Sequence, residues 1–207
     1  MIIIMESIIK AQTPIDTPEC FSSIADKLLN ETVLMINSQA YRICEIEFYL
    51  YNEAHPDEYV HRHVDQATYG CWYFHKYNTG TYKNGTYKGM DISIGGSDGG
   101  KGGILIRSIY DPYEGKMIEG PCRCVNFILE KYGVNSINEL VGEGGLLSVV
   151  NNDRGFHVCD ASNDDKEPLR WGPRIGLSEK YPEYRQKRYR YVVGGVKKEK
   201  GKLVGVS

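Results

Sequence analysis

The chain has 207 residues, of which 41% are apolar and 25% are charged, and its net charge is −2. This length and composition predict a single globular domain, residues 1–207, and exclude a disordered chain. The six cysteines include no pair separated by two residues, which excludes a zinc knuckle and a small disulfide framework. They predict reduced thiols, and therefore an intracellular protein of the cytoplasm or nucleus that is not secreted.

The two ends of the chain differ from its middle. Residues 1–14 begin with an apolar run that lacks a basic segment, so we interpret them as an extension and expect no signal peptide and no membrane association. Residues 185–202 contain eight Lys or Arg and one Glu, a local charge of +7 that leaves −9 for the remainder. The basic run predicts a flexible tail at 197–207 and salt-sensitive binding to a polyanion. A solvated strand with a frayed end would explain the same charges.

Three helices are predicted from capping signals and apolar spacing. Residues 17–29 begin with a Thr-Pro pair typical of a helix start, and apolar residues then recur along one helical face. A second helix is expected to start at Pro121 and to end at Gly133. Ser136 and Glu139 form a capping box for a third, short helix.

Strands are predicted to outnumber helices. We expect them at residues 32–37, 41–50, 90–94, 104–106, 146–150, 156–160 and 189–196. Residues 52–78 are interpreted as a long loop with one helical turn, and Asn84-Gly85 as the turn of a hairpin. Few helical crossovers separate the strands, which indicates an α+β fold with a curved, mostly antiparallel sheet and flanking helices.

Two motifs suggest sites but do not meet the requirements for them. The glycine-rich run at 95–103 resembles a phosphate-binding P-loop, but Gly102 follows its lysine where Ser or Thr is needed, and a strand follows instead of a helix. We therefore expect a hairpin loop there. His61 and His63, with His55 and Asp57 nearby, lack a third fixed ligand on one element, so no metal is expected.

The predicted strand at 41–50 carries the most informative pattern. Alternation places apolar side chains on one face and two acids beside a tyrosine on the other. The two sets are Cys44, Ile46, Phe48 and Leu50, and Glu45, Glu47 and Tyr49. A glutamate beside a tyrosine in a pocket can act as a general base on water. An ordinary charged strand face is the alternative.

Seven short segments, in this order and spacing, resemble the alkyladenine (3-methyladenine) DNA glycosylase family. They are EIEFYL (45–50), DEYVH (57–61), GTY (80–82), GMDIS (89–93), GILIR (103–107), EGPCR (119–123) and PRIG (173–176). The resemblance implies the family's fold and a cofactor-free, monofunctional DNA glycosylase of base excision repair. Such a hydrolase flips a damaged (alkylated or deaminated) purine and hydrolyses its N-glycosidic bond.

The resemblance also implies roles for individual residues. Glu47 would be the general base that holds a water, and Arg107 would share that water or orient the carboxylate. The extruded base would be stacked and hydrogen-bonded by a larger set: Tyr49, His61, Asp91, and a tyrosine of the hairpin, Tyr82 or Tyr87. Arg123 and Arg174 would contact phosphates. The partner is then nucleic acid, DNA or alternatively RNA, bound by a monomer.

The sequence departs from the family at three points. The family's hairpin is apolar and carries an aromatic wedge, whereas residues 83–86 are polar (KNGT). Asp91 stands where the family has asparagine, and the body of the chain is acidic. These departures predict a preference for single-stranded or distorted substrates. Two other functions fit the same pocket: a protein that binds a nucleobase or nucleotide without cleaving it, and an enzyme acting on RNA or free nucleosides.

Overall fold

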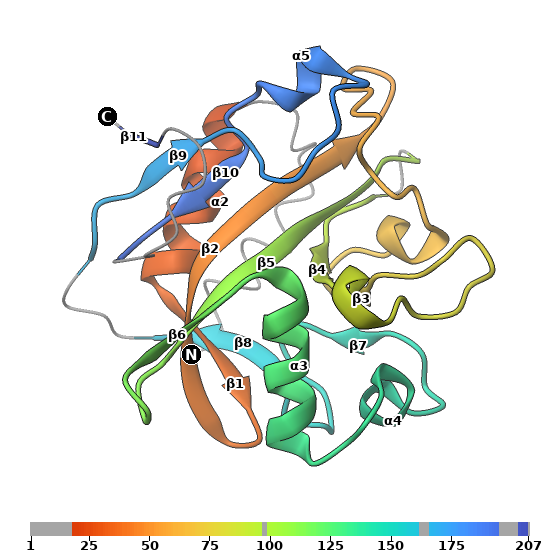
Figure 1. Ribbon diagram of the computed structural model, residues 1–207, viewed down its shortest axis with the longest axis vertical. Helices are drawn as coiled ribbons and strands as arrows, with labels where there is room; N and C mark the ends of the chain where they lie inside the picture. Colours follow the sequence, from red (N-terminus) through yellow and green to blue (C-terminus); the bar gives the residue numbers. More distant parts are fainter. Residues whose placement is uncertain (1–17, 97–98, 162–165, 195–202, 207) are drawn as a thin grey trace.

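The computed structural model of the protein describes residues 18–96, 99–161, 166–194 and 203–206. At its centre two long strands, β2 (Gln39–Tyr51) and β5 (Lys101–Asp111), pair antiparallel along most of their length (Figure 1). Three strands continue the sheet beyond β5: β4 (Met90–Ser93), β3 (Cys71–Phe74) and β7 (Leu147–Ser148). Three continue it beyond β2: β10 (Arg190–Val192), β9 (Arg170–Gly172) and β11 (Val204–Gly205).

Three further strands leave this main path. β1 (Thr32–Ile36) forms a hairpin with β2 and also pairs with β8 (His157–Asp160). The turn of that hairpin consists of Asn37 and Ser38, which both have positive φ, a conformation that asparagine tolerates better than most residues. β6 (Lys116–Glu119) pairs with the end of β5.

Two helices cover the sheet because each has an apolar face. α2 (Pro18–Asn30) packs along β2 and β10, where the ring of Phe21 stacks on Phe48 with centroids 4.4 Å apart. α3 (Pro121–Tyr132) packs against β5 and β6 and ends at Gly133, whose φ of 63° is left-handed. The short elements are η1 (Val64–Ala67), η2 (Gly85–Tyr87), α4 (Ile137–Val141) and α5 (Pro182–Arg185).

The chain is therefore a single α+β domain with a mostly antiparallel open sheet and a few helices, as the sequence predicted. The three predicted helices are present, and Ser136 accepts a hydrogen bond from the backbone N–H of Glu139 as expected of a cap. The glycine-rich run connects two antiparallel strands, β4 and β5, which confirms the prediction of a hairpin connection.

Two predictions about residues 52–87 are wrong. The supposed loop contains the expected helical turn, η1, but also a strand, β3, which was not predicted; β3 shows no alternation because three of its four residues are buried. The tight turn of the following hairpin is not at Asn84-Gly85, which begins η2. It lies between Tyr77 and Thr81, where the N–H of Tyr77 donates to the carbonyl of Thr81 and Gly80 supplies a positive φ.

The C-terminal region also differs from expectation. Val204 and Gly205 pair with β9, and the neighbouring Leu203 and Val206 pack against the core. The prediction of a flexible tail is thus wrong for residues 203–206, while residues 197–202 and the extension 1–14 lie outside the described residues. Among the helices that the structure describes, none combines the length and the apolar character needed to cross a bilayer.

Candidate active site

The two faces of β2 differ as the alternation predicted. Ile46 and Phe48 belong to the hydrophobic core, and Glu45 and Glu47 project from the opposite face. That second face is not open to solvent, however, since Glu47 is 0% exposed. The register between β2 and β5 shifts around Glu45, and Arg107 falls within this irregularity. Irregularities of this kind re-aim side chains and often lie beside active sites.

Glu47 is held by three donors. The Tyr49 hydroxyl donates to its Oε2 at 2.7 Å, and the backbone N–H of Ile175 donates to its Oε1 at 2.7 Å. Arg107 Nη1 lies 3.4 Å from the same Oε1, so the structure brings the two predicted catalytic residues together. Burial and the neighbouring Glu47 carboxylate raise the pKa of Tyr49, which keeps its hydroxyl protonated and able to donate.

Glu45 forms the second half of this buried ion cluster. It accepts hydrogen bonds from Arg190 Nε at 2.6 Å, Ser108 at 2.8 Å and Arg107 Nε at 3.1 Å. Burial alone would lower the pKa of Arg107, but the carboxylates of Glu47 and Glu45 outweigh burial and raise it. Arg190, which looks like part of the basic tail in the sequence, is instead fully buried against an acid of β2.

Arg174 also lies inside the protein, so the prediction that it contacts phosphate is wrong. It is 4% exposed, and its two terminal nitrogens contact the Asp57 carboxylate at 2.5 and 3.2 Å. Its guanidinium carbon lies 4.4 Å from the centre of the Tyr49 ring. Arg174 therefore supports the tyrosine of the site. The predicted phosphate contact of Arg123 stays a prediction; this residue is exposed in the first turn of α3.

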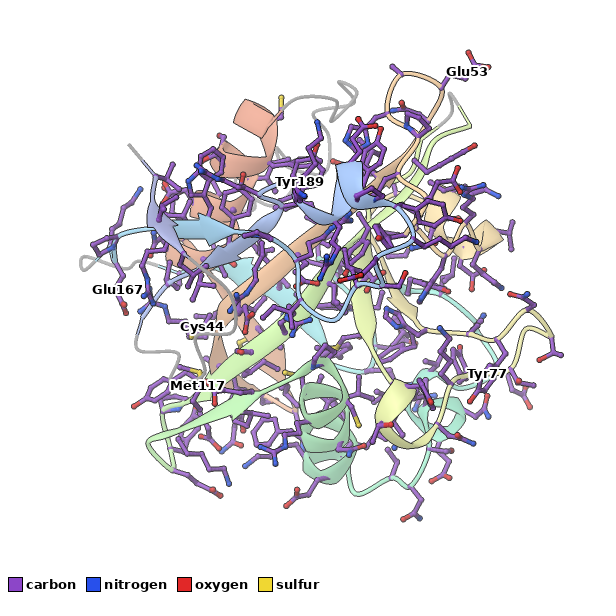
Figure 2. All side chains as sticks on the ribbon, turned by 45° about the horizontal axis from the view of Figure 1, so that its top comes forward. Cys44, Glu53, Tyr77, Met117, Glu167 and Tyr189 are labelled. Carbon is purple, nitrogen blue, oxygen red and sulfur yellow. The ribbon has the colours of Figure 1, made fainter. Side chains whose placement is uncertain are left out.

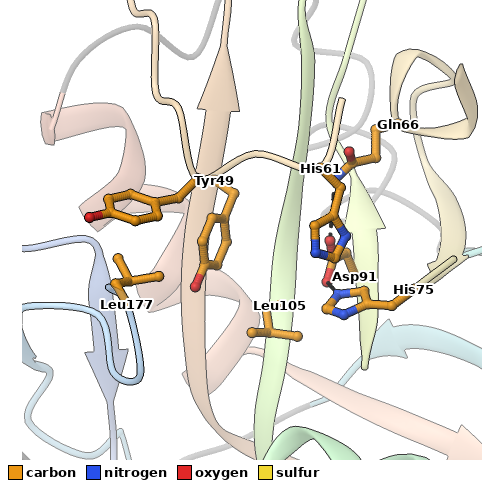
Figure 3. Close-up of a pocket in the computed structure, with 8 residues that line it drawn as sticks. Tyr49, His61, Gln66, His75, Asp91, Leu105 and Leu177 are labelled. Carbon is orange, nitrogen blue, oxygen red and sulfur yellow. Dashed lines mark hydrogen bonds and ion pairs between the residues drawn. The ribbon is translucent and has the colours of Figure 1, made fainter. Parts of the chain in front are cut away.

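A cavity of about 120 Å³ opens beside this cluster (Figure 3). It is lined by Tyr49, Tyr59, His61, Gln66, His75, Asp91, Leu105 and Leu177. A cavity of about 150 Å³ holds a benzene molecule in another protein, so an open pocket of this size suits a planar ring. Three of the predicted base-binding residues, Tyr49, His61 and Asp91, are brought together here. Glu47 does not line the cavity but lies directly behind Tyr49.

The pocket contains a histidine–aspartate pair that sequence reasoning did not find. His75 Nε2 lies 2.9 Å from Asp91 Oδ1, and both side chains are largely buried. The glycines at positions 89 and 103 make room for the pair, because a Cβ atom at either position would lie 2.5 Å from His75 or Asp91. Gln66 Nε2 approaches the other carboxylate oxygen at 3.4 Å. Asp91, His75 and Gln66 thus form a fixed set of polar groups at one side of the pocket.

His61 lies beside this pair, with its ring centroid 4.4 Å from that of His75 (Figure 3). His61 is exposed on one side, and on the other its imidazole lies edge-on to the rings of Tyr73 and His75. Burial, together with the charge that His75 can carry, lowers the pKa of His61 to about 4. His61 is therefore neutral at pH 7, and its Nε2 accepts from Lys83 Nζ at 3.2 Å.

The two hairpin tyrosines do not line this pocket, and their contact with a base stays a prediction. Tyr82 packs edge-on against Phe74 with ring centroids 6.4 Å apart, and Lys76 covers its ring. Tyr87 lies in η2 and is 70% exposed. Tyr59 provides the second aromatic ring of the pocket instead. Within the described part of the chain, no group of three His, Cys, Asp or Glu is arranged to hold a metal ion.

Comparison with known proteins identifies one clear relative. No family model matches the sequence. The chain is 42% identical over 197 residues to "Uncharacterized protein L759" of Acanthamoeba polyphaga mimivirus, an alignment that covers 88% of this chain and 91% of the relative. Identity at this level extends over almost the whole of both chains. The protein therefore belongs to the same family as this mimivirus protein.

Proposed function

We propose that the protein is a glycosylase-like hydrolase that binds a purine base in its pocket and cleaves the N-glycosidic bond. In this proposal its fold and chemistry resemble those of the alkyladenine DNA glycosylases, and it acts inside the cell on damaged bases in nucleic acid, DNA in preference to RNA. The observation that carries it is the hydrogen bond between Glu47 and Tyr49. Because Tyr49 lines the cavity, an acid lies one side chain behind a pocket lined by aromatic rings.

The contacts of the site suggest how the reaction would proceed. The base would stack on Tyr49 and meet the polar groups of Asp91 and His75. Glu47, with Arg107 beside it, would activate water and stabilise the cationic sugar that forms as the base leaves. Since Glu47 has no exposed surface, Tyr49 or the segment at 173–177 has to shift to admit the water.

A second function, binding of a nucleobase or nucleotide without cleavage, is favoured by one specific observation. Both oxygens of Glu47 accept hydrogen bonds from the protein, and the carboxylate is 0% exposed. A carboxylate held in this way resembles a structural group that positions Tyr49 and the chain at Ile175. In that case the pocket would bind a base and release it unchanged.

The decisive experiment is a base-release assay with Glu47→Gln. Oligonucleotides bearing hypoxanthine or an alkylated adenine are incubated with the protein, and free base is quantified. We expect the substitution to reduce release by a factor of about a hundred or more, since a general base typically contributes that much. Affinity for the same oligonucleotides should change far less, because Glu47 does not line the cavity.

Two matched variants separate chemistry from folding. Glu45→Gln removes the same charge from the same buried cluster and lowers stability, but it leaves Glu47 and Tyr49 in place, so folded Glu45→Gln should release base faster than folded Glu47→Gln. Glu53→Gln changes an exposed glutamate at the periphery (Figure 2) and should have no effect. Wild-type protein that binds the oligonucleotides but releases no base would establish the second function. Equal loss in both cluster variants would make Glu47 a structural residue.

A further inference from the structure

A second, wider hollow adjoins the base pocket and shares one residue with it. Its volume is about 490 Å³, and His61 borders both cavities. Apart from His61, its lining is mainly polar and comes from the hairpin that follows β3. This lining includes Lys76, Asn78, Thr79 and Lys83. A molecule with a base in the first pocket would therefore project its remaining groups past His61 into this hollow.

The charges of the hollow favour an anion. Lys76 Nζ contacts the Asp65 carboxylate at 2.6 Å, so its charge is matched within the protein. Lys83 differs, because its Nζ contacts only the neutral imidazole of His61 and no described carboxylate forms an ion pair with it. Lys83 is half-buried, and this burial lowers its pKa. A partly desolvated ammonium without a carboxylate partner is stabilised when an anion binds beside it.

We propose that this hollow, defined by Lys76, Asn78, Thr79 and Lys83, binds the phosphate group of a nucleotide whose base occupies the adjoining pocket. This proposal rests on the proposed function in one respect: the adjoining pocket has to hold a base. It does not require that the glycosidic bond is cleaved. Lysine, threonine and asparagine are donors that commonly contact phosphate oxygens. The ligand class is then a nucleotide rather than a free base or nucleoside, with Lys83 as the residue that distinguishes them.

The test compares the binding of inosine and inosine 5′-monophosphate by calorimetry. The monophosphate should bind at least about tenfold more tightly, as expected for a charge-assisted hydrogen bond. Lys83→Met should abolish this difference while changing inosine affinity far less than that of the monophosphate, and Lys83→Arg should retain the difference. Lys88→Met is the matched control, because Lys88 contacts Asn126 on α3 and does not line the hollow.

Two further arms identify the source of the phosphate. If the phosphate belongs to a nucleic-acid strand, the Lys83→Met variant should bind a short single strand with one hypoxanthine more weakly than wild type does. If only the monophosphate responds, the ligand is a free nucleotide. Release of hypoxanthine is measured in parallel, so a protein that binds but does not cleave contradicts the proposed hydrolysis alone. Three results would overturn the phosphate site. They are equal affinity for inosine and its monophosphate, no binding of either, and an equal loss of affinity for both in Lys83→Met.

Discussion

Asp91 fits into the pocket because the residue beside it, at position 103, is a glycine and has no side chain. Gly103 lies on β5, which pairs with β4, the strand of Asp91. A Cβ atom added at position 103 would lie 2.5 Å from Asp91 Oδ2 and 2.7 Å from the Cβ of Asp91. Gly89 has the same relation to the ring of His75. Since neither glycine has a positive φ, their role is to leave space rather than to permit an unusual backbone conformation. The two glycines therefore determine where the histidine–aspartate pair can lie.

This role predicts the effect of Gly103→Ala. The new methyl group has to displace Asp91, so we expect the free energy of unfolding to fall by about 1–3 kcal/mol, as for other overpacked sites. Affinity for inosine should also weaken, because the displaced carboxylate lines the pocket. Chemical denaturation and calorimetry measure the two effects. Gly144→Ala is the control, since a Cβ atom there meets nothing within 4 Å. Unchanged stability and affinity in Gly103→Ala would refute the spatial role of Gly103.

Residues of the site differ in how far their place could be predicted. Glu47 and Tyr49 share a strand face, and period-two alternation was sufficient to place them together. Arg174 could not be placed in this way, because its partner Asp57 lies 117 residues away in the sequence. A basic residue with a distant buried partner looks the same in the sequence as one that is free to bind phosphate. The sequence alone therefore misassigned it.

At the scale of elements, long patterned segments were predictable and short buried ones were not. β2 and α3 carry enough residues for their periodicity to be recognised. β3 has four residues, and its buried pattern lacks alternation because it packs on both faces. The hairpin turn after β3 was likewise misplaced, because the Asn84-Gly85 pair is a strong turn signal in the sequence and begins η2 instead. The strand pairing that places His75 beside Asp91 is a tertiary contact.

The corrected hairpin predicts which substrates are cleaved fastest. Its turn is Asn78-Thr79-Gly80, which is polar and offers no aromatic wedge to fill a base stack. Extrusion from a paired duplex costs a few kcal/mol and costs least where the base is already unpaired. We therefore expect base release to be fastest from a single strand, slower from a mismatch and slowest from a paired duplex. The measurement compares these rates for one lesion in the three contexts.

The opposite order of rates would have a specific explanation. Tyr87 is 70% exposed on η2, more than Tyr77 beside the turn (39%), and could therefore act as a wedge. If the paired duplex is cleaved fastest, Tyr87→Ser should slow duplex cleavage and leave single-strand cleavage unchanged. In that event our interpretation of the polar hairpin would be wrong.

At the scale of the whole molecule, the ion cluster beneath the pocket pairs as many acids as arginines. Three acids, Glu45, Glu47 and Asp57, lie within or close to ion-pair distance of three arginines inside the domain. Removing one partner of a buried pair typically costs about 3–5 kcal/mol, because the other charge is left uncompensated. The chain can therefore place a charged cluster beneath its pocket without a net buried charge. The fold class was predictable from patterning, whereas this balance depends on contacts between distant segments.

The neutral state of His61 predicts how acid affects the stability of the whole domain. Its pKa is about 4 in the folded protein, below the ordinary histidine value of 6.5 that applies to the unfolded chain. Between these pH values the unfolded state binds more protons, so stability falls as the pH is lowered from 6.5 towards 4. His61→Asn removes this contribution, and the variant should lose less stability than wild type between pH 7 and pH 4.5. Urea denaturation at both pH values measures the difference.

Carboxylates that become protonated in this range affect both proteins alike, so they cancel in the comparison. An identical loss in the two proteins would mean that the imidazole of His61 titrates as freely in the folded state as in the unfolded chain.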